Sequence, residues 1–130
     1  MHALHIAILD DVPIICEMLT ELCRAQGYTV DSFYSPMEAL AALETRAYDV
    51  IVSDMKMPGM SGTELYARIQ ARDPAQAARM LFITGDVLTA ETREFFERTG
   101  CPYIPKPFKA KALHDSIAAL LERSVGGEEV

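Results

Sequence analysis

Five side chains suited to metal or phosphate chemistry stand at the ends of short apolar runs. They are Asp10 and Asp11 after the run 4–9, Asp54 after 48–53, Thr84 at the end of 79–84, and Lys106 just beyond 101–104. Three carboxylates brought together repel one another, so such a cluster requires a proton or a cation. A set of oxygen ligands favours a hard cation, which predicts Mg2+, with Mn2+ as the alternative, and disfavours zinc.

These groups together can support phosphoryl transfer to a carboxylate. Mg2+ keeps several waters and so leaves a position for a phosphate oxygen. Lys106 can pair with the phosphoryl group, and the Thr84 hydroxyl can donate to it. Taken singly, each residue is more often a helix cap, a loop residue or a solvated side chain, so the prediction depends on their joint placement.

The elements that must position these side chains follow from the pattern of apolar residues. Strands are expected at 4–9, 28–32, 48–53, 79–84 and 101–104, and helices at about 13–26, 36–46, 63–71, 88–98 and 109–123. This alternation predicts an α/β fold, a doubly wound (βα)5 sheet of five parallel strands with right-handed crossovers. Ligands of such sheets bind at the carboxyl ends of the strands, where the five side chains would converge.

The first helix has a buried stripe and an exposed apolar group beside it. The stripe is expected to hold the residues at helical spacing: Val12, Ile15, Cys16, Leu19, Leu22 and Cys23. The two cysteines of this stripe are interpreted as reduced core residues. Pro13, Ile14 and Met18 cluster next to the expected site, and clustered exposed apolar residues mark interfaces. They are predicted to form a partner-docking face, with chance surface apolarity as the alternative.

Composition limits the class of protein. The 130 residues fit one domain, expected at 1–125, followed by a disordered tail at 126–130. The formal net charge of −7 and the lack of a basic stripe argue against nucleic-acid binding. No apolar run approaches the roughly 20 residues that span a bilayer, and the N-terminus lacks the features of a signal peptide. A cytoplasmic location with no membrane segment is therefore expected.

Four motifs built on these residues make the chain resemble the CheY-like receiver domains of bacterial response regulators. They are Ile-Leu-Asp-Asp at 8–11, Ser-Asp-Met-Lys-Met-Pro-Gly-Met-Ser-Gly at 53–62, Phe-Ile-Thr-Gly-Asp at 82–86 and Pro-Lys-Pro-Phe at 105–108. The resemblance extends from about His5 to Arg123. It implies a flavodoxin-like strand order, 2-1-3-4-5, and a cis peptide bond between Lys106 and Pro107.

The resemblance also implies a role for each acidic residue. Asp54 is the expected phosphoacceptor, and the donor is a phosphohistidine of a histidine kinase or of a histidine phosphotransfer protein. Mg2+ is expected to bind Asp54, to bind Asp11 directly and Asp10 largely through water, and to bind the backbone carbonyl of Lys56. Such a domain is a signalling phosphoacceptor and not an enzyme, because it catalyses only its own phosphorylation and dephosphorylation.

A surface switch is the output that the resemblance implies. Thr84 and Lys106 would hold the phosphoryl oxygens. The added charge of about −1.5 to −2 would draw Thr84 inward while the ring of Tyr103 turns in behind it. The surface of the fourth helix, the fifth strand and the last helix would then control a downstream protein target. Pro105 departs from the family pattern and would stiffen the end of the fifth strand.

The fourth helix is expected to add an apolar residue to that surface. Leu88 and Phe95 share its buried face, so Phe96 is expected to point outward beside the switch as part of a partner face. Position 56 varies among receivers, and Lys56 is placed to pair with Asp86 across the mouth of the site.

Other functions are open to the same residues. A phosphatase of the haloacid dehalogenase type also uses an aspartyl phosphate, Mg2+, a hydroxyl and a lysine. That class needs an aspartate two residues after the nucleophile as general acid and base, and Lys56 occupies this position. A degenerate receiver that works without phosphorylation usually lacks a site residue, and none is missing here. As a receiver, the chain is either a stand-alone regulator or the receiver of a hybrid histidine kinase. The segment 95–102 resembles the same region of receivers fused to hybrid kinases.

Overall fold

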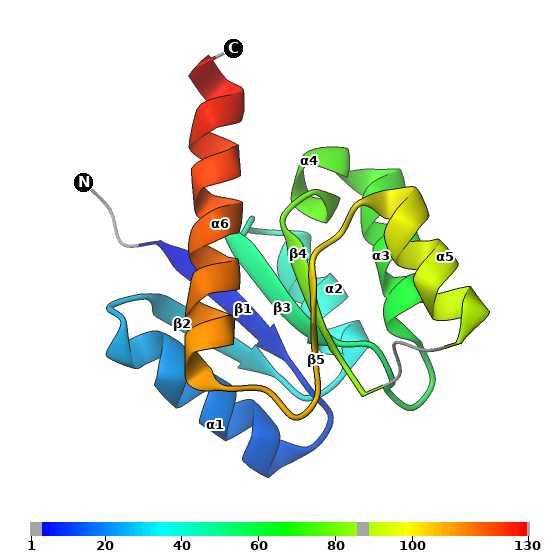
Figure 1. Cartoon of the computed structure of the whole chain (residues 1–130), viewed down its shortest axis with the longest axis horizontal. Coiled ribbons are helices and arrows are strands. Elements are labelled where there is room, and N and C mark those ends of the chain that lie inside the picture. The colour runs from blue at the N-terminus through cyan, green and yellow to red at the C-terminus, as the bar shows by residue number, and fades with distance from the viewer. Residues whose placement is uncertain (1–3, 86–88, 130) are drawn as a thin grey trace.

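The computed structural model describes residues 4–85 and 89–129, with 124–129 as helical backbone only. Its elements are β1 (His5–Leu9), α1 (Pro13–Ala25), β2 (Thr29–Phe33), α2 (Pro36–Leu43), β3 (Val50–Asp54), α3 (Gly62–Arg72), α4 (Pro74–Ala77), β4 (Met80–Thr84), α5 (Ala90–Thr99), β5 (Tyr103–Pro105) and α6 (Ala110–Glu129). All strand pairs are parallel, in the order β2-β1-β3-β4-β5 (Figure 1). The predicted α/β architecture and strand order are confirmed.

The sheet is apolar on both faces because helices cover both. Every residue of β3 and β4 is buried, as expected of central parallel strands. Alternate side chains supply two cores: one packs against α1 and α6, and the other against α2, α3 and α5 (Figure 1). Cys16 and Cys23 lie in the first core, as predicted, and burial raises the pKa of Cys23 to about 11.

Local sequence signals start the helices. Ser35, Ser61 and Thr89 accept hydrogen bonds from the backbone N–H groups of the first turns of α2, α3 and α5, which satisfies donors that have no partner within the helix. Gly100 ends α5 in a left-handed conformation with φ 71°, a role that glycine fills without strain. None of the described helices is long and apolar enough to cross a membrane.

The structure corrects four expectations about the elements. Val12 is not on the buried stripe: it is the N-cap of α1 and is 43% exposed. Residues 74–77 form the short helix α4 instead of a loop, because Asp73 caps a new turn and Pro74 suits its first position. The fifth strand is Tyr103–Pro105, shifted toward Lys106. Helix α6 is Ala110–Glu129, which is longer than the helix expected at about 109–123.

Candidate functional site

Three carboxylates meet at the carboxyl edge of the sheet. Asp10 and Asp11 follow β1, Asp54 ends β3, and one oxygen of each lies within 4.8 Å of the others. Asp10 is 1% exposed and Asp54 is 7% exposed. We name Asp10, Asp11 and Asp54 the acidic cluster. The oxygen-only set and its spacing fit one hard divalent cation.

The acidic cluster is electrostatically unfavourable on its own. Burial raises the pKa of Asp10, and the nearby charge of Asp54 raises it further. The N–H of Val12 donates to the Asp10 carboxylate at 2.9 Å, and this bond, together with Lys106, opposes the shift. The net shift is still upward, with burial as its largest cause, so the ionised form of Asp10 is disfavoured. A cation at this point would favour the ionised form.

Thr84 is the last residue of β4, and Lys106 directly follows β5. The ammonium of Lys106 lies 3.4 Å from a carboxylate oxygen of Asp54. Its backbone N–H donates to the carbonyl of Thr84 at 2.8 Å, which ties the lysine to the end of β4. Thr84 itself is 1% exposed. The peptide bond between Lys106 and Pro107 is cis, as predicted.

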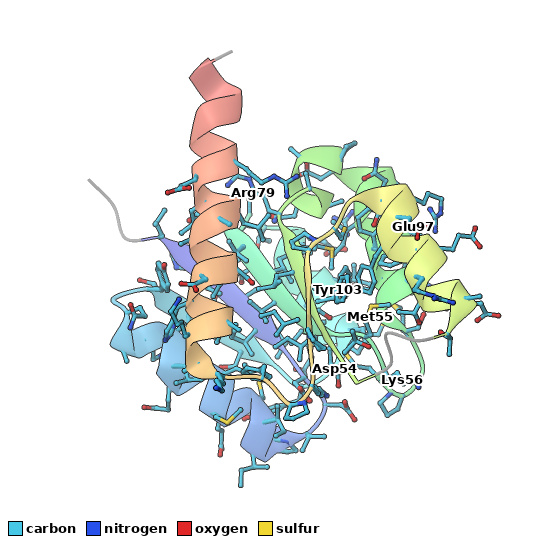
Figure 2. All side chains as sticks on the ribbon, in the orientation of Figure 1. Asp54, Met55, Lys56, Arg79, Glu97 and Tyr103 are labelled. Atoms are coloured by element: carbon cyan, nitrogen blue, oxygen red, sulfur yellow. The ribbon has the colours of Figure 1, made fainter. Side chains whose placement is uncertain are left out.

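The loop after β3 is held against the acidic cluster by buried methionines. Met55, Met57 and Met60 are each 7–8% exposed, so the backbone of Lys56 between them is fixed while its side chain is exposed. The N–H of Lys56 donates to Asp54 at 3.4 Å, and Asp54 and Lys56 lie at the same edge in Figure 2. This arrangement was missed from the sequence, although the alternation of methionine with lysine and proline is a signal for it.

A glycine lets this loop close. A Cβ at Gly62 would lie 2.7 Å from the Met55 sulfur, closer than real Cβ atoms approach, and 3.0 Å from a ring carbon of Phe82, which is a tight contact. The Gly62 N–H donates to the carbonyl of Met55 at 2.7 Å. The start of α3 is therefore packed directly against the residue that follows Asp54.

Five rings lie beneath and beside α5, and we name them the aromatic cluster: Tyr66, Phe82, Phe95, Phe96 and Tyr103. Phe95 contacts Tyr66, Phe82 and Phe96 with centroid distances of 5.5, 5.6 and 5.2 Å. The ring of Tyr103 stacks on Phe96 at 4.2 Å with planes 23° apart. In Figure 2 Tyr103 lies on the strand side of α5.

The prediction of an exposed Phe96 is wrong. Phe96 is 7% exposed, and the ring at the surface is Tyr103, which is 43% exposed. Two consecutive residues of α5 are buried because Phe95 packs on the sheet while Tyr103 covers Phe96 from the side. Leu88, and Asp86 with its predicted pair to Lys56, lie outside the described residues.

The expected partner face on α1 is exposed. Ile14 is 72% exposed, Met18 is 42% exposed, and Pro13 is also exposed. Met18 also lines a shallow groove, together with Ile15, Lys106, Pro107 and Phe108. Two further large side chains with apolar surface are exposed between β2 and the start of α2: Tyr34 at 45% and Met37 at 61%. The sequence did not single out their exposure, because neither belongs to a periodic pattern.

Known proteins match this chain in sequence and in structure. Residues 6–118 match the family model of the response regulator receiver domain. The DNA-binding transcriptional regulator NtrC of Salmonella typhimurium is 31% identical over 118 residues, which cover 91% of this chain and 24% of that protein. The C4-dicarboxylate transport regulator DctD of Rhizobium meliloti is 32% identical over 109 residues, covering 84% and 23%. The chain thus spans about a quarter of the length of these curated relatives.

Solved structures agree over nearly the whole chain. A CheY-like receiver domain protein of Methanospirillum hungatei superposes with a TM-score of 0.88 at 26% identity, covering 97% of this chain and 99% of that one. The chemotaxis response regulator CheY4 of Vibrio cholerae gives 0.82 at 25% identity, covering 92% and 100%.

Proposed function

The chain belongs to the response regulator receiver domain family and is a phosphorelay receiver of the two-component type, and from this premise we propose which residues carry the reaction. Asp54 accepts the phosphoryl group. Asp10, Asp11, Asp54 and the carbonyl of Lys56 hold Mg2+, with Mn2+ able to replace it. The observation that carries the proposal is the contact of buried Asp54 with Lys106 at 3.4 Å, inside a cluster of three carboxylates.

The chemistry follows from the charges. A carboxylate oxygen of Asp54 attacks the phosphorus of a phosphohistidine, an O–P bond forms, and the P–N bond to the imidazole breaks. When bound, Mg2+ supplies positive charge against the phosphoryl oxygens. Lys106 and the backbone N–H of Lys56 both donate to Asp54, which holds its carboxylate in a fixed orientation for in-line attack. Lys106 then neutralises charge on the transferred group.

The output is proposed to pass through β4 and β5. The Thr84 hydroxyl donates to the phosphoryl group, and Tyr103 leaves its stacked position and turns inward, a population shift between two packings. The surface of α5, β5 and α6 changes with it and controls a downstream protein. Phe96 acts beneath this surface as the base on which Tyr103 rests, and not as an exposed contact.

The donor is proposed to be a histidine kinase or a histidine phosphotransfer protein that docks on Pro13, Ile14 and Met18. Replacing Ile14 and Met18 together by Asp should slow transfer from the cognate donor and leave phosphorylation by acetyl phosphate unchanged. Equal loss in both assays would remove the docking role. Binding to nucleic acid or membrane is not expected of this chain, given its net charge of −7, and a cytoplasmic location remains the expectation.

Intact mass spectrometry tests the phosphoacceptor. The protein is incubated with Mg2+ and acetyl phosphate, and one added phosphoryl mass is expected. Asp54→Asn should show no adduct, and EDTA should suppress the adduct in the natural sequence. An adduct that persists in the variant would refute the role of Asp54. Steady release of phosphate from unrelated phosphomonoesters would instead support the phosphatase alternative, which Lys56 disfavours.

A further inference from the structure

A hollow with an apolar floor lies between α2, α3 and α4. Leu40, Leu43 and Ile69 supply its apolar lining, which we name the floor, and Arg46, Arg72, Asp73 and Gln76 supply its polar lining, which we name the rim. Leu40 and Ile69 are 8% and 3% exposed. The lining comes from the carboxyl ends of α2 and α3, which lie at the edge of the sheet opposite the acidic cluster because the helices run back along the strands. The proposed phosphoryl chemistry does not use this hollow.

Three of the four rim residues are already held by the protein. Arg46 lies 2.6 Å from a carboxylate oxygen of Asp31. The Gln76 amide accepts from the N–H of Tyr48 at 2.8 Å and donates to its carbonyl at 3.0 Å. Asp73 accepts from the backbone N–H of Gln76 at 3.2 Å. These bonds fix the walls, so the shape of the hollow does not depend on a ligand.

The fourth rim residue has no such partner. Within the described part of the chain, the Arg72 side chain makes no hydrogen bond and no ion pair. A guanidinium is a planar fork of donors that matches a carboxylate. The carboxylate of Asp73 on the same rim opposes a second negative charge. The charges therefore suit a monoanion better than a phosphate dianion.

Size and floor define the rest of the ligand. The hollow measures about 200 Å³, below the roughly 300–1,000 Å³ of pockets for drug-sized ligands, so the ligand must be small. Three aliphatic side chains on the floor favour an apolar body. We propose that this hollow binds a small monocarboxylate with an apolar body, of the class of a short-chain fatty acid, with its carboxylate on Arg72.

Hexanoate is the probe for this site. Titrated into 15N-labelled protein and followed by amide chemical shifts, it should saturate with a Kd on the order of 1 mM. The shifts should cluster at Leu43, Ile69, Arg72 and Gln76. Arg72→Gln should weaken binding about tenfold, the loss expected of one charge-assisted hydrogen bond. Arg68→Gln is the matched control, since Arg68 lies on the same helix but pairs with Glu64 at 3.6 Å and does not line the hollow.

Two further probes separate the parts of the proposal. Acetate lacks the apolar body and hexanol lacks the charge, and each should bind at least about tenfold more weakly than hexanoate. Acetate equal to hexanoate would overturn the role of the floor, and hexanol equal to hexanoate would overturn the role of Arg72. Linear shifts without saturation, or shifts centred on Lys106, would refute the site. Asp54→Asn should bind hexanoate like the natural sequence, so this test stands apart from that of the phosphoacceptor.

Discussion

The acidic cluster and the aromatic cluster differ in how well their side chains are accommodated by their neighbours. Asp10 and Asp54 are buried carboxyl groups next to one another, and burial, more than the neighbouring Asp54, raises the pKa of Asp10. The aromatic cluster carries no charge, and its rings contact one another at 4.2–6.0 Å. A ligand can release much free energy at the first region. The second can respond only by repacking.

Strand β4 joins the two regions. Phe82 and Thr84 are two residues apart and so point to the same face of the sheet. Phe82 belongs to the aromatic cluster and is paired in register with Tyr103, while Thr84 lies at the acidic edge, paired with Pro105. A change at Thr84 therefore has a short route to Tyr103 along neighbouring strands.

Removing the lysine should give the largest effect, and it should be confined to the chemistry. Lys106→Met is expected to slow phosphorylation by acetyl phosphate by roughly 10²–10³-fold, because one donor to the developing charge is lost. Lys111→Met is the control, since the Lys111 side chain is 84% exposed and pairs with Asp115, away from the acidic cluster. The measurement is the rate of phosphoryl incorporation by intact mass. A loss of less than about threefold would show that Lys106 is not part of the site.

Removing the ring beneath Tyr103 should show the reverse pattern. Phe96→Ala is expected to lower the free energy of unfolding by about 3 kcal/mol, at the low end for phenylalanine truncation, because the site lies near the surface. Phosphorylation of the folded fraction should change little. Urea unfolding measures the stability, with Tyr34→Ala as an exposed aromatic control that is expected to change it by less than about 0.5 kcal/mol. Equal losses in both variants would deny that the aromatic cluster is tightly packed.

Neutralising one buried carboxylate should stabilise the protein when no metal is present. In EDTA, Asp10→Asn is expected to raise the free energy of unfolding by about 1 kcal/mol, because it relieves burial of a charge beside Asp54. The amide oxygen can still accept from the N–H of Val12. In Mg2+ the order should reverse, since only the natural sequence gains from binding. A variant that is less stable in EDTA would contradict the electrostatic account of the acidic cluster.

Asp31 differs from Asp10 because its pKa is lowered, and its carboxylate should therefore stabilise the fold at neutral pH. Burial favours a higher pKa for Asp31, but hydrogen bonds from Tyr48 and Arg46 lower it overall. A lowered folded-state pKa stabilises above the unfolded value of about 4 and is lost as pH falls through the folded value. Asp31→Asn should therefore be slightly less stable at pH 7, with a difference that shrinks below about pH 4. A constant difference from pH 7 to pH 3 would exclude this cause.

The acidic edge could be predicted from sequence because its logic is local. Each of Asp10, Asp54 and Thr84 follows or ends an apolar run, and parallel strands bring such ends together whatever the details of packing. The same reasoning gave the sheet and its faces. This prediction did not depend on how the helices pack against one another.

The aromatic cluster could not be predicted because its logic is tertiary. Helical periodicity assigned one of the two adjacent phenylalanines to solvent, but Tyr103 reaches over from β5 to cover Phe96. Likewise, Asp73 in isolation indicates a helix end, whereas in the structure its side chain caps α4, whose Gln76 is bonded to Tyr48. Contacts between distant segments decided both cases.

Chemical mapping of the phosphorylated residue tests the central claim most directly. After phosphorylation by acetyl phosphate and Mg2+, borohydride reduces an aspartyl phosphate to homoserine, and peptide mass spectrometry locates the change. The account predicts homoserine at position 54 alone, with none when EDTA is present. Homoserine at position 10 or 11, or a phosphoryl group on any residue other than Asp54, would contradict it.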